Sequence, residues 1–109
     1  MTGDKTKAMS SCHACAQACE ECVASCLRNT EMAHMAPCIL SNLDCAQICR
    51  TCAGLIARDS RHTADAICLC VAVCQECADI CSQYDNDHCQ SCAAICRQCV
   101  DACLLLNGD

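Results

Sequence analysis

Cysteine is the residue type with which this chain could do chemistry. Nineteen of its 109 residues are cysteine, and within four runs the thiols recur every three or four residues. A thiolate is a nucleophile, a redox group and a ligand for soft metal ions, so the spacing has to decide among these roles. Residues three and four apart lie on one face of an α-helix. The pattern therefore predicts helices that each carry one continuous stripe of thiols.

An internal repeat supports this prediction. The segments 15–22, 45–52, 70–77 and 92–99 each have the form C-x3-C-x2-C, which places one copy on each of four helices. The stripes extend beyond the repeats in the same register and include every cysteine except Cys68. The stripe cysteines are Cys12, Cys15, Cys19, Cys22, Cys26, Cys38, Cys45, Cys49, Cys52, Cys70, Cys74, Cys77, Cys81, Cys89, Cys92, Cys96, Cys99 and Cys103.

Turn and capping residues separate the four runs. Pro37 is typical of a first helical turn and predicts the start of the second helix. The polar segments 58–62 and 85–88 are typical of turns before the third and fourth helices. Asp87 and Gln90 resemble a capping box at the start of the fourth helix.

We expect four helices, near residues 8–28, 37–57, 64–84 and 88–106. Residues 1–7 are expected to be flexible. Because the connections are short, neighbouring helices must run antiparallel. The sequence therefore predicts an all-α fold with a single domain over residues 1–109, an antiparallel up-down-up-down four-helix bundle with a cysteine-lined core.

Composition excludes several functions. A net charge of −6 argues against nucleic-acid binding, which requires a basic face. No window approaches 18 consecutive apolar residues, so we expect no membrane span. Residues 1–12 contain lysines but no apolar stretch typical of a secretory signal. We therefore expect a cytoplasmic protein, in which thiols are kept reduced.

A disulfide scaffold and an inert core explain the stripes poorly. Residues three or four apart on a helix have Cβ atoms ~5–6 Å apart, whereas a disulfide requires ~3.5–4.5 Å. Cysteine does pack as a small apolar residue. However, eighteen in register would bury less area than leucine and leave a weak core unless something else occupied the space.

An enzymatic function also explains the cysteine stripes poorly. C-x3-C-x2-C also occurs in radical enzymes that use S-adenosylmethionine, but there it lies on a loop of a domain larger than this chain. Thiol–disulfide exchange needs an exposed, low-pKa thiol at a helix N-terminus. The sequence also offers no pair of nucleophile and base, so we expect no enzymatic activity.

Metal binding remains. Zinc sites use four ligands that converge from turns, and four thiolates leave about two negative charges around each Zn²⁺. Cu(I) is monovalent, prefers sulfur ligands and accepts two of them in a line, which spans ~4.5 Å. Thiols along one stripe or on facing helices can reach this separation. The capacity would be on the order of one copper per cysteine. A metallothionein-like scavenger of several soft metals, such as zinc or cadmium, is the alternative.

Four copies of C-x3-C-x2-C on a cysteine-lined bundle resemble the cytosolic branch of the bacterial copper storage proteins, over residues from about 9 to 106. The resemblance implies that many Cu(I) ions are held by the stripe cysteines inside each bundle. It also implies a homotetramer, with copper chaperones as candidate partners. Apolar residues outside the stripe on the second helix fit an oligomer, namely Ile39, Leu40, Leu43, Ile48 and Leu55.

Antiparallel helices bring different residues to the two ends of the bundle. One end, which we call the closed end, should be plugged by Met9, Ile56, Ile67 and Leu106, with His13 and His62 nearby. The other end, the mouth, should collect Met32, His34, Met35 and His88 as weaker copper ligands, together with the carboxylates of Glu31, Asp85 and Asp87. We expect copper to enter there, toward Cys26, Cys38, Cys81 and Cys89.

Two residues break the pattern. Cys68 lies two residues before Cys70 and should point away from the stripe, so it is not expected to be a ligand of the core. Asn42 occupies a stripe position that cysteine fills in the first and fourth helices. Its amide could either position a neighbouring thiol by hydrogen bonding or mark a hydrated spot.

Overall fold

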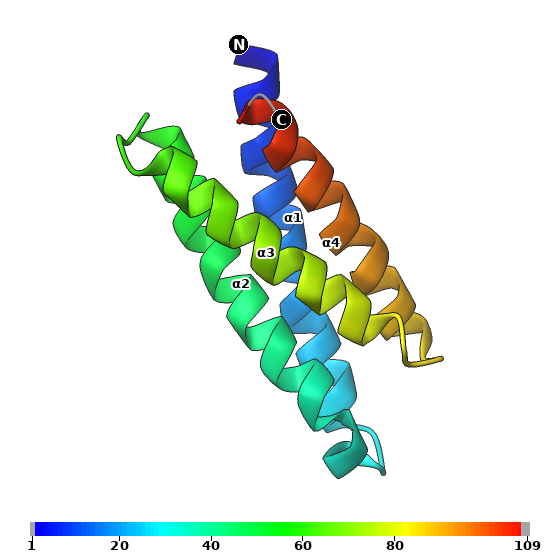
Figure 1. Cartoon of the computed structure of the whole chain (residues 1–109). Coiled ribbons are helices and arrows are strands. Elements are labelled where there is room, and N and C mark those ends of the chain that lie inside the picture. Colours follow the sequence, from blue (N-terminus) through cyan, green and yellow to red (C-terminus); the bar gives the residue numbers. More distant parts are fainter. Residues whose placement is uncertain (1, 108–109) are drawn as a thin grey trace.

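The computed structural model describes residues 2–107 and consists of four helices (Figure 1). The helices are α1 (Thr2–Leu27), α2 (Ala36–Ala57), α3 (Thr63–Cys81) and α4 (Asp87–Leu106), with a short 3₁₀ turn, η1 (Met32–Met35), between the first two. Each helix contains one C-x3-C-x2-C repeat, as the sequence predicted.

The helices form a closed ring of four neighbours. Helices α1 and α3 each pack closely against both α2 and α4, whereas in the described part of the chain the diagonal pairs meet through core side chains and not through close backbone approach. The bundle is elongated, with extents of 45 × 18 × 17 Å. Short connections alternate between its two ends (Figure 1), which confirms the predicted up-down-up-down topology.

Two helix ends differ from the prediction. Helix α1 begins at Thr2 rather than near residue 8, so the described part of the segment expected to be flexible is helical. An ion pair of 2.9 Å between Lys5 Nζ and Asp59 Oδ1 holds this first turn against the α2–α3 connection. Residue 1 lies outside the described residues. Helix α3 ends at Cys81, three residues earlier than expected. Tyr84 lies in the turn that follows, and its hydroxyl donates to the carbonyl oxygen of His34 at 2.9 Å.

The predicted capping box at Asp87 is wrong, whereas the role predicted for Pro37 is confirmed. Asn86 is the N-cap of α4, and Asp87 is already helical. The Gln90 amide donates instead to the carbonyl oxygens of Ser82 and Tyr84, at 3.0 and 2.7 Å. The side chain therefore satisfies the end of α3, a long-range role that local spacing does not reveal.

Cysteine side chains make up most of the core. The stripe cysteines are at most 2% exposed, and the large apolar side chains buried with them are Met35, Ile56 and Ile67. Buried alanines flank the stripes on all four helices and allow the helices to approach closely, namely Ala16, Ala46, Ala53, Ala78 and Ala93. The helices thus enclose a continuous column of thiols, which we call the thiol column.

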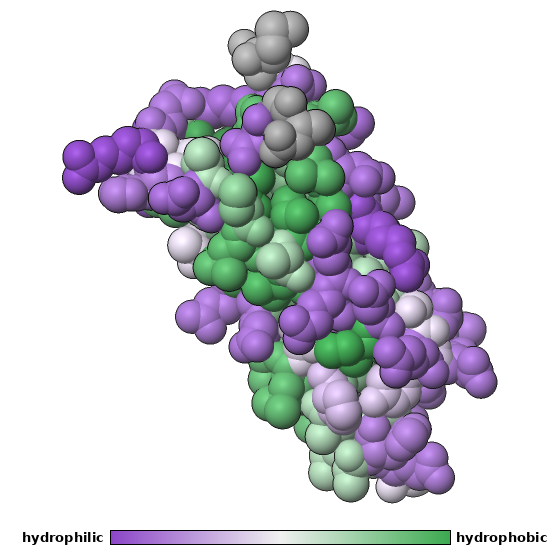
Figure 2. Space-filling view, viewed as in Figure 1, coloured by the Kyte–Doolittle hydropathy of each residue, from purple (hydrophilic) through white to green (hydrophobic). Residues whose placement is uncertain are grey.

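The outer surface is mixed. Hydrophobic residues gather over α3 in Figure 2, while hydrophilic residues cover the outer side of α4 and the α2–α3 connection. By length and composition alone, α4 is long and apolar enough to cross a membrane. Its five cysteines face the thiol column, so the core accounts for much of that apolar character.

Candidate metal centre

The thiol column brings sulfur atoms from different helices into contact. The Sγ atoms of Cys38 and Cys81 lie 3.4 Å apart, and those of Cys45 and Cys74 lie 3.5 Å apart. Contacts also join α1 to α4, where Cys12 Sγ lies 3.7 Å from Cys103 Sγ. All 19 cysteines are free thiols. The structure therefore brings together the eighteen stripe cysteines, and only the exposed Cys68 stays outside the column.

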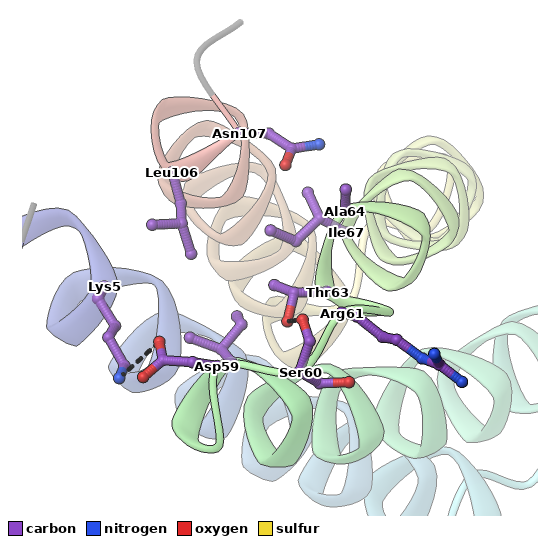
Figure 3. Close-up of a pocket in the computed structure, with 10 residues that line it drawn as sticks. Lys5, Asp59, Ser60, Arg61, Thr63, Ala64, Ile67, Leu106 and Asn107 are labelled. Atoms are coloured by element: carbon purple, nitrogen blue, oxygen red, sulfur yellow. Dashed lines mark hydrogen bonds and ion pairs between the residues drawn. The ribbon is translucent and has the colours of Figure 1, made fainter.

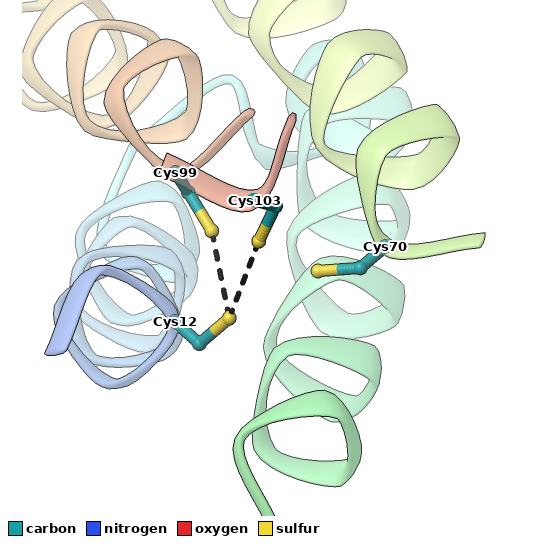
Figure 4. A group of neighbouring side chains, drawn as sticks. All are labelled: Cys12, Cys70, Cys99 and Cys103. Carbon is teal, nitrogen blue, oxygen red and sulfur yellow. Dashed lines mark hydrogen bonds between the residues drawn. The ribbon is translucent and has the colours of Figure 1, made fainter. Parts of the chain in front are cut away.

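Several sets of four sulfurs could each surround a metal ion. Within a set, all the sulfur atoms lie within 4.8 Å of one another. Figure 4 shows a set toward the closed end, in which Cys12 Sγ contacts the Sγ atoms of Cys99 and Cys103 of α4 while Cys70 approaches from α3. Three further sets overlap with it in turn along the column, namely Cys15, Cys49, Cys74 and Cys99, then Cys15, Cys19, Cys45 and Cys96, then Cys19, Cys77, Cys92 and Cys96. A separate set at the mouth consists of Cys22, Cys26, Cys38 and Cys89. Because the four overlapping sets share members, this part of the column offers sulfurs that can bridge successive ions.

Hydrogen bonds between neighbouring thiols divide them into proton donors and acceptors. The hydrogen bond from Cys12 lowers the pKa of Cys103 to about 5, and the same contact raises the pKa of Cys12. Burial is the main cause that raises the pKa of Cys89 to about 11. Adjacent sulfurs thus share protons. A cation that binds a pair of thiols must displace a proton from that pair.

Asn42 is the polar residue inside the column, and it is 0% exposed. Its Nδ2 donates to the Cys38 carbonyl oxygen at 2.7 Å and approaches the Sγ atoms of Cys38, Cys81 and Cys22 at 3.3, 3.2 and 3.7 Å. Its Oδ1 accepts from two more thiols, Cys92 at 3.0 Å and Cys77 at 3.5 Å. Of the two alternatives that the sequence left open, the structure favours hydrogen bonding, because one amide links thiols of all four helices.

The mouth residues differ in how closely they approach the thiols. His88 Nδ1 lies 3.5 Å from Cys22 Sγ and 3.4 Å from Cys89 Sγ, so an imidazole extends the column by one layer. Met35 is buried in the core, 2% exposed. Met32 and His34 are exposed, and the His34 ring packs edge-on against Tyr84 with centroids 5.4 Å apart. The structure therefore joins His88 to the thiols and leaves Met32 and His34 at the rim.

The closed end has the predicted apolar composition. Ile56 and Ile67 are 2% and 1% exposed, and the half-buried Met9 and Leu106 pack against the same core.

A four-helix bundle whose core is a column of overlapping four-sulfur sets defines a binder of several soft metal ions. The comparisons with known proteins agree with this class. The family model described as "Copper storage protein" matches residues 1–107. The chain belongs to the copper storage protein family.

Known relatives cover most of the chain. The cysteine-rich protein YhjQ of Bacillus subtilis (strain 168), itself described as uncharacterized, is 33% identical over 80 residues, which span 73% of this chain and 74% of YhjQ. The copper storage protein Ccsp from Streptomyces lividans loaded with 10 copper equivalents is 31% identical with a TM-score of 0.94, covering 97% of this chain and 85% of that one. The Cu(I)-bound copper storage protein BsCsp3 is 30% identical with a TM-score of 0.91, covering 95% and 98%.

The contacts of Asn42 lead to a prediction about stability. Replacing Asn42 with alanine removes six recorded contacts and leaves a cavity among thiols, so we expect the free energy of unfolding of the reduced, metal-free protein to fall by about 1–3 kcal/mol. Urea denaturation followed by circular dichroism measures the change. Ser41→Ala is the control, since Ser41 is buried at the adjacent position but takes no part in these contacts. Equal losses in the two variants would contradict a special role for the amide.

Proposed function

We propose that this protein stores and buffers many Cu(I) ions inside its bundle, with the eighteen stripe cysteines as ligands. The observation that carries this proposal is the continuity of the thiol column: four of the four-sulfur sets share members in turn, and Asn42 joins Cys92 of these sets to Cys22 and Cys38 of the set at the mouth. An isolated set would suit one structural ion, whereas shared sulfurs suit an array of ions. Cu(I) balances thiolates one to one, so an array of it leaves little uncompensated charge in the buried column.

The sulfur spacing suits this cargo. Contacts of 3.4–4.0 Å between thiols are shorter than the ~4.5 Å spanned by a linear S–Cu–S unit, so the side chains must move apart by only about 1 Å as copper enters. With each sulfur bridging two ions, the capacity is on the order of one copper per stripe cysteine. The ions then fill the space along the axis that leucine occupies in an ordinary bundle.

A scavenger of divalent soft metals such as zinc or cadmium is the second candidate, because four-sulfur sets also suit tetrahedral zinc. It is the weaker one, since several Zn²⁺ thiolate sites would leave about two negative charges each in the buried column. An enzymatic role has less support still. His88 does pair with thiols, but the two that it contacts, Cys22 and Cys89, are 2% and 0% exposed, so a substrate has little access to them.

A stoichiometric titration separates the two candidates. With Cu(I) added under strict reduction against a competing chelator, we expect saturation near one copper per stripe cysteine, whereas zinc should saturate at about four or five ions. Cys74→Ala should lower the copper capacity by about one ion. The control variant Cys68→Ala should leave it unchanged, because Cys68 is exposed and outside the column. Saturation of copper at four or five ions would contradict storage in an array.

We also propose that copper enters at the mouth, with His88, Met35, His34 and Met32 as its ligands there. The position of His88 Nδ1, within 3.5 Å of two thiols from different helices, supports a hand-off from imidazole to thiolate. Met32 and His34 lie further out and would meet the ion first. The carboxylates of Glu31, Asp85 and Asp87 attract cations to this end. A copper chaperone with a basic docking face is therefore a candidate partner.

Removing the mouth ligands should affect rate and leave capacity intact. We expect His88→Ala to slow Cu(I) uptake roughly tenfold in stopped-flow measurements, and the fourfold replacement Met32→Leu, His34→Ala, Met35→Leu, His88→Ala to slow it further. His13→Ala is the matched control, because His13 is an exposed histidine toward the closed end. Unaltered uptake in the fourfold variant would overturn the assignment.

We infer a cytoplasmic location from two observations. The bundle needs reduced thiols to bind metal, and the cytoplasm keeps them reduced. The structurally similar protein from Streptomyces lividans is described as a cytosolic copper storage protein.

A homotetramer is the assembly we propose. On α2, Leu40 and Leu43 are 64% and 48% exposed and lie three residues apart on one face of the helix, and neighbouring exposed apolar side chains of this kind suit contact with another chain. Sedimentation should therefore give a mass four times the 11.6 kDa of one chain. We expect the double variant Leu40→Glu, Leu43→Glu to sediment as a smaller species, while Leu105→Glu on α4 is the control. A monomeric wild-type chain would contradict the proposal.

A further inference from the structure

The thiols nearest the mouth are covered. We call the four-sulfur set at this end, Cys22, Cys26, Cys38 and Cys89, the mouth set, and all four of its cysteines are buried. Met35 is part of their cover, because it is buried in the same core and precedes Cys38 by three residues, one helical turn further out. A metal ion that arrives at the mouth therefore reaches the mouth set only when this cover moves.

The cover includes η1, a short element that is weakly embedded in the fold. Three of its four residues are exposed, and the buried one is Met35. The backbone of η1 packs closely against α1 and α2 but not against α3 or α4. A segment with few buried side chains and an exposed backbone opens locally at a much smaller cost in free energy than a long helix does. The cover of the mouth can therefore open without unfolding the bundle.

The cover of the closed end is built differently. Ile56 and Ile67 are buried there within the long helices α2 and α3, and Leu106 ends α4. A cavity of about 530 Å³ lies outside these side chains, and Figure 3 shows the ion pair between Lys5 and Asp59 at its edge. Uncovering the thiols at this end would require turns of long helices to unwind. Local opening is therefore expected at the mouth.

Tyr84 joins η1 to the opposite side of the mouth. It lies in the α3–α4 connection, and its hydroxyl donates to the carbonyl oxygen of His34 at 2.9 Å. Its ring packs edge-on against the His34 imidazole and also against the buried core. The Gln90 amide donates to the carbonyl oxygen of Tyr84 at 2.7 Å and so anchors this residue to α4. A chain of contacts thus leads from α4 through Tyr84 to η1.

Building on the entry at the mouth proposed above, we propose that Tyr84 is a positioning residue that latches η1 over the mouth set and limits how fast these thiols are reached. Among the described residues, its hydroxyl makes the hydrogen bond that links η1 to the α3–α4 connection. Because the acceptor is a backbone carbonyl, this bond fixes the path of η1 itself. When the bond breaks, η1 stays tied to α1 and α2, its neighbours in sequence, and moves outward together with Met35.

The test measures access to each thiol in the reduced, metal-free protein. Iodoacetamide alkylates a buried cysteine only when its cover opens, so the initial rate follows the population of the open form. Mass spectrometry then gives this rate for individual cysteines. Tyr84→Phe keeps the ring and removes the hydroxyl, so we expect the mouth set to react roughly 2- to 10-fold faster, as the loss of one hydrogen bond implies. Cys12 and Cys103, toward the closed end, should react at the wild-type rate.

Ser82→Ala is the matched control. The Ser82 hydroxyl lies in the same connection and donates to the carbonyl oxygen of Asp79 at 2.8 Å, a bond that does not cross the mouth. This variant loses one hydroxyl and one hydrogen bond, as Tyr84→Phe does, and we expect no faster alkylation of the mouth set. Equal rates in the two variants would overturn the latch. Equal acceleration at both ends of the bundle in Tyr84→Phe would overturn it too, since the hydroxyl would then stabilise the bundle as a whole.

Copper uptake separates the latch from the function on which it rests. Tyr84→Phe should take up Cu(I) faster by a similar factor, with an unchanged capacity. Faster alkylation of the mouth set with unaltered copper uptake would uphold the latch and refute entry at the mouth. A wild-type protein that fails to fill with copper would refute storage itself, while the alkylation rates, which need no copper, still decide on the latch.

Discussion

The whole structure depends on the narrow space that four closely packed helices leave along their common axis. Buried alanines such as Ala46 and Ala93 bring the helices together, and the sequence has no phenylalanine or tryptophan to hold them apart. Cysteine fits this space but buries less apolar area than leucine, so a thiol core alone contributes little hydrophobic stabilisation. Cargo that bonds to those thiols supplies interactions between helices that the side chains do not. Capacity and stability are therefore linked through the same atoms.

Much of the fold could be predicted because one period governs it. Thiols three and four residues apart can share a face only on a helix, and four copies joined by short connections leave a single topology. What escaped prediction depends on contacts between distant segments. The extension of α1 to Thr2 accompanies an ion pair with Asp59, and Gln90 serves the end of α3 rather than the start of its own helix. Spacing within one helix carries no information about either contact.

The candidate site shows the same division. The sequence predicted which thiols face inward, since register alone determines that. It left Asn42 open, because an amide in a stripe position has two physical explanations, and only the positions of thiols from the other three helices decide between them. It grouped His88 with Met32 and His34, whereas the structure separates them, since His88 begins a helix whose next residue is a column cysteine. The mouth and the closed end of the bundle thus differ in both charge and ligand type, although the arrangement of the four helices is the same at both ends.

The lack of aromatic residues has an optical consequence. Tyr84 is the chain's one tyrosine, and its hydroxyl and ring both contact His34 at the mouth. The rest of the molecule hardly absorbs in the near ultraviolet, so bands from metal–thiolate charge transfer stand out against an almost transparent background. Intrinsic fluorescence comes from the rim alone. Tyrosine fluorescence therefore reports on the mouth of the bundle, while charge-transfer absorption reports on the metal ions bound in the thiol column.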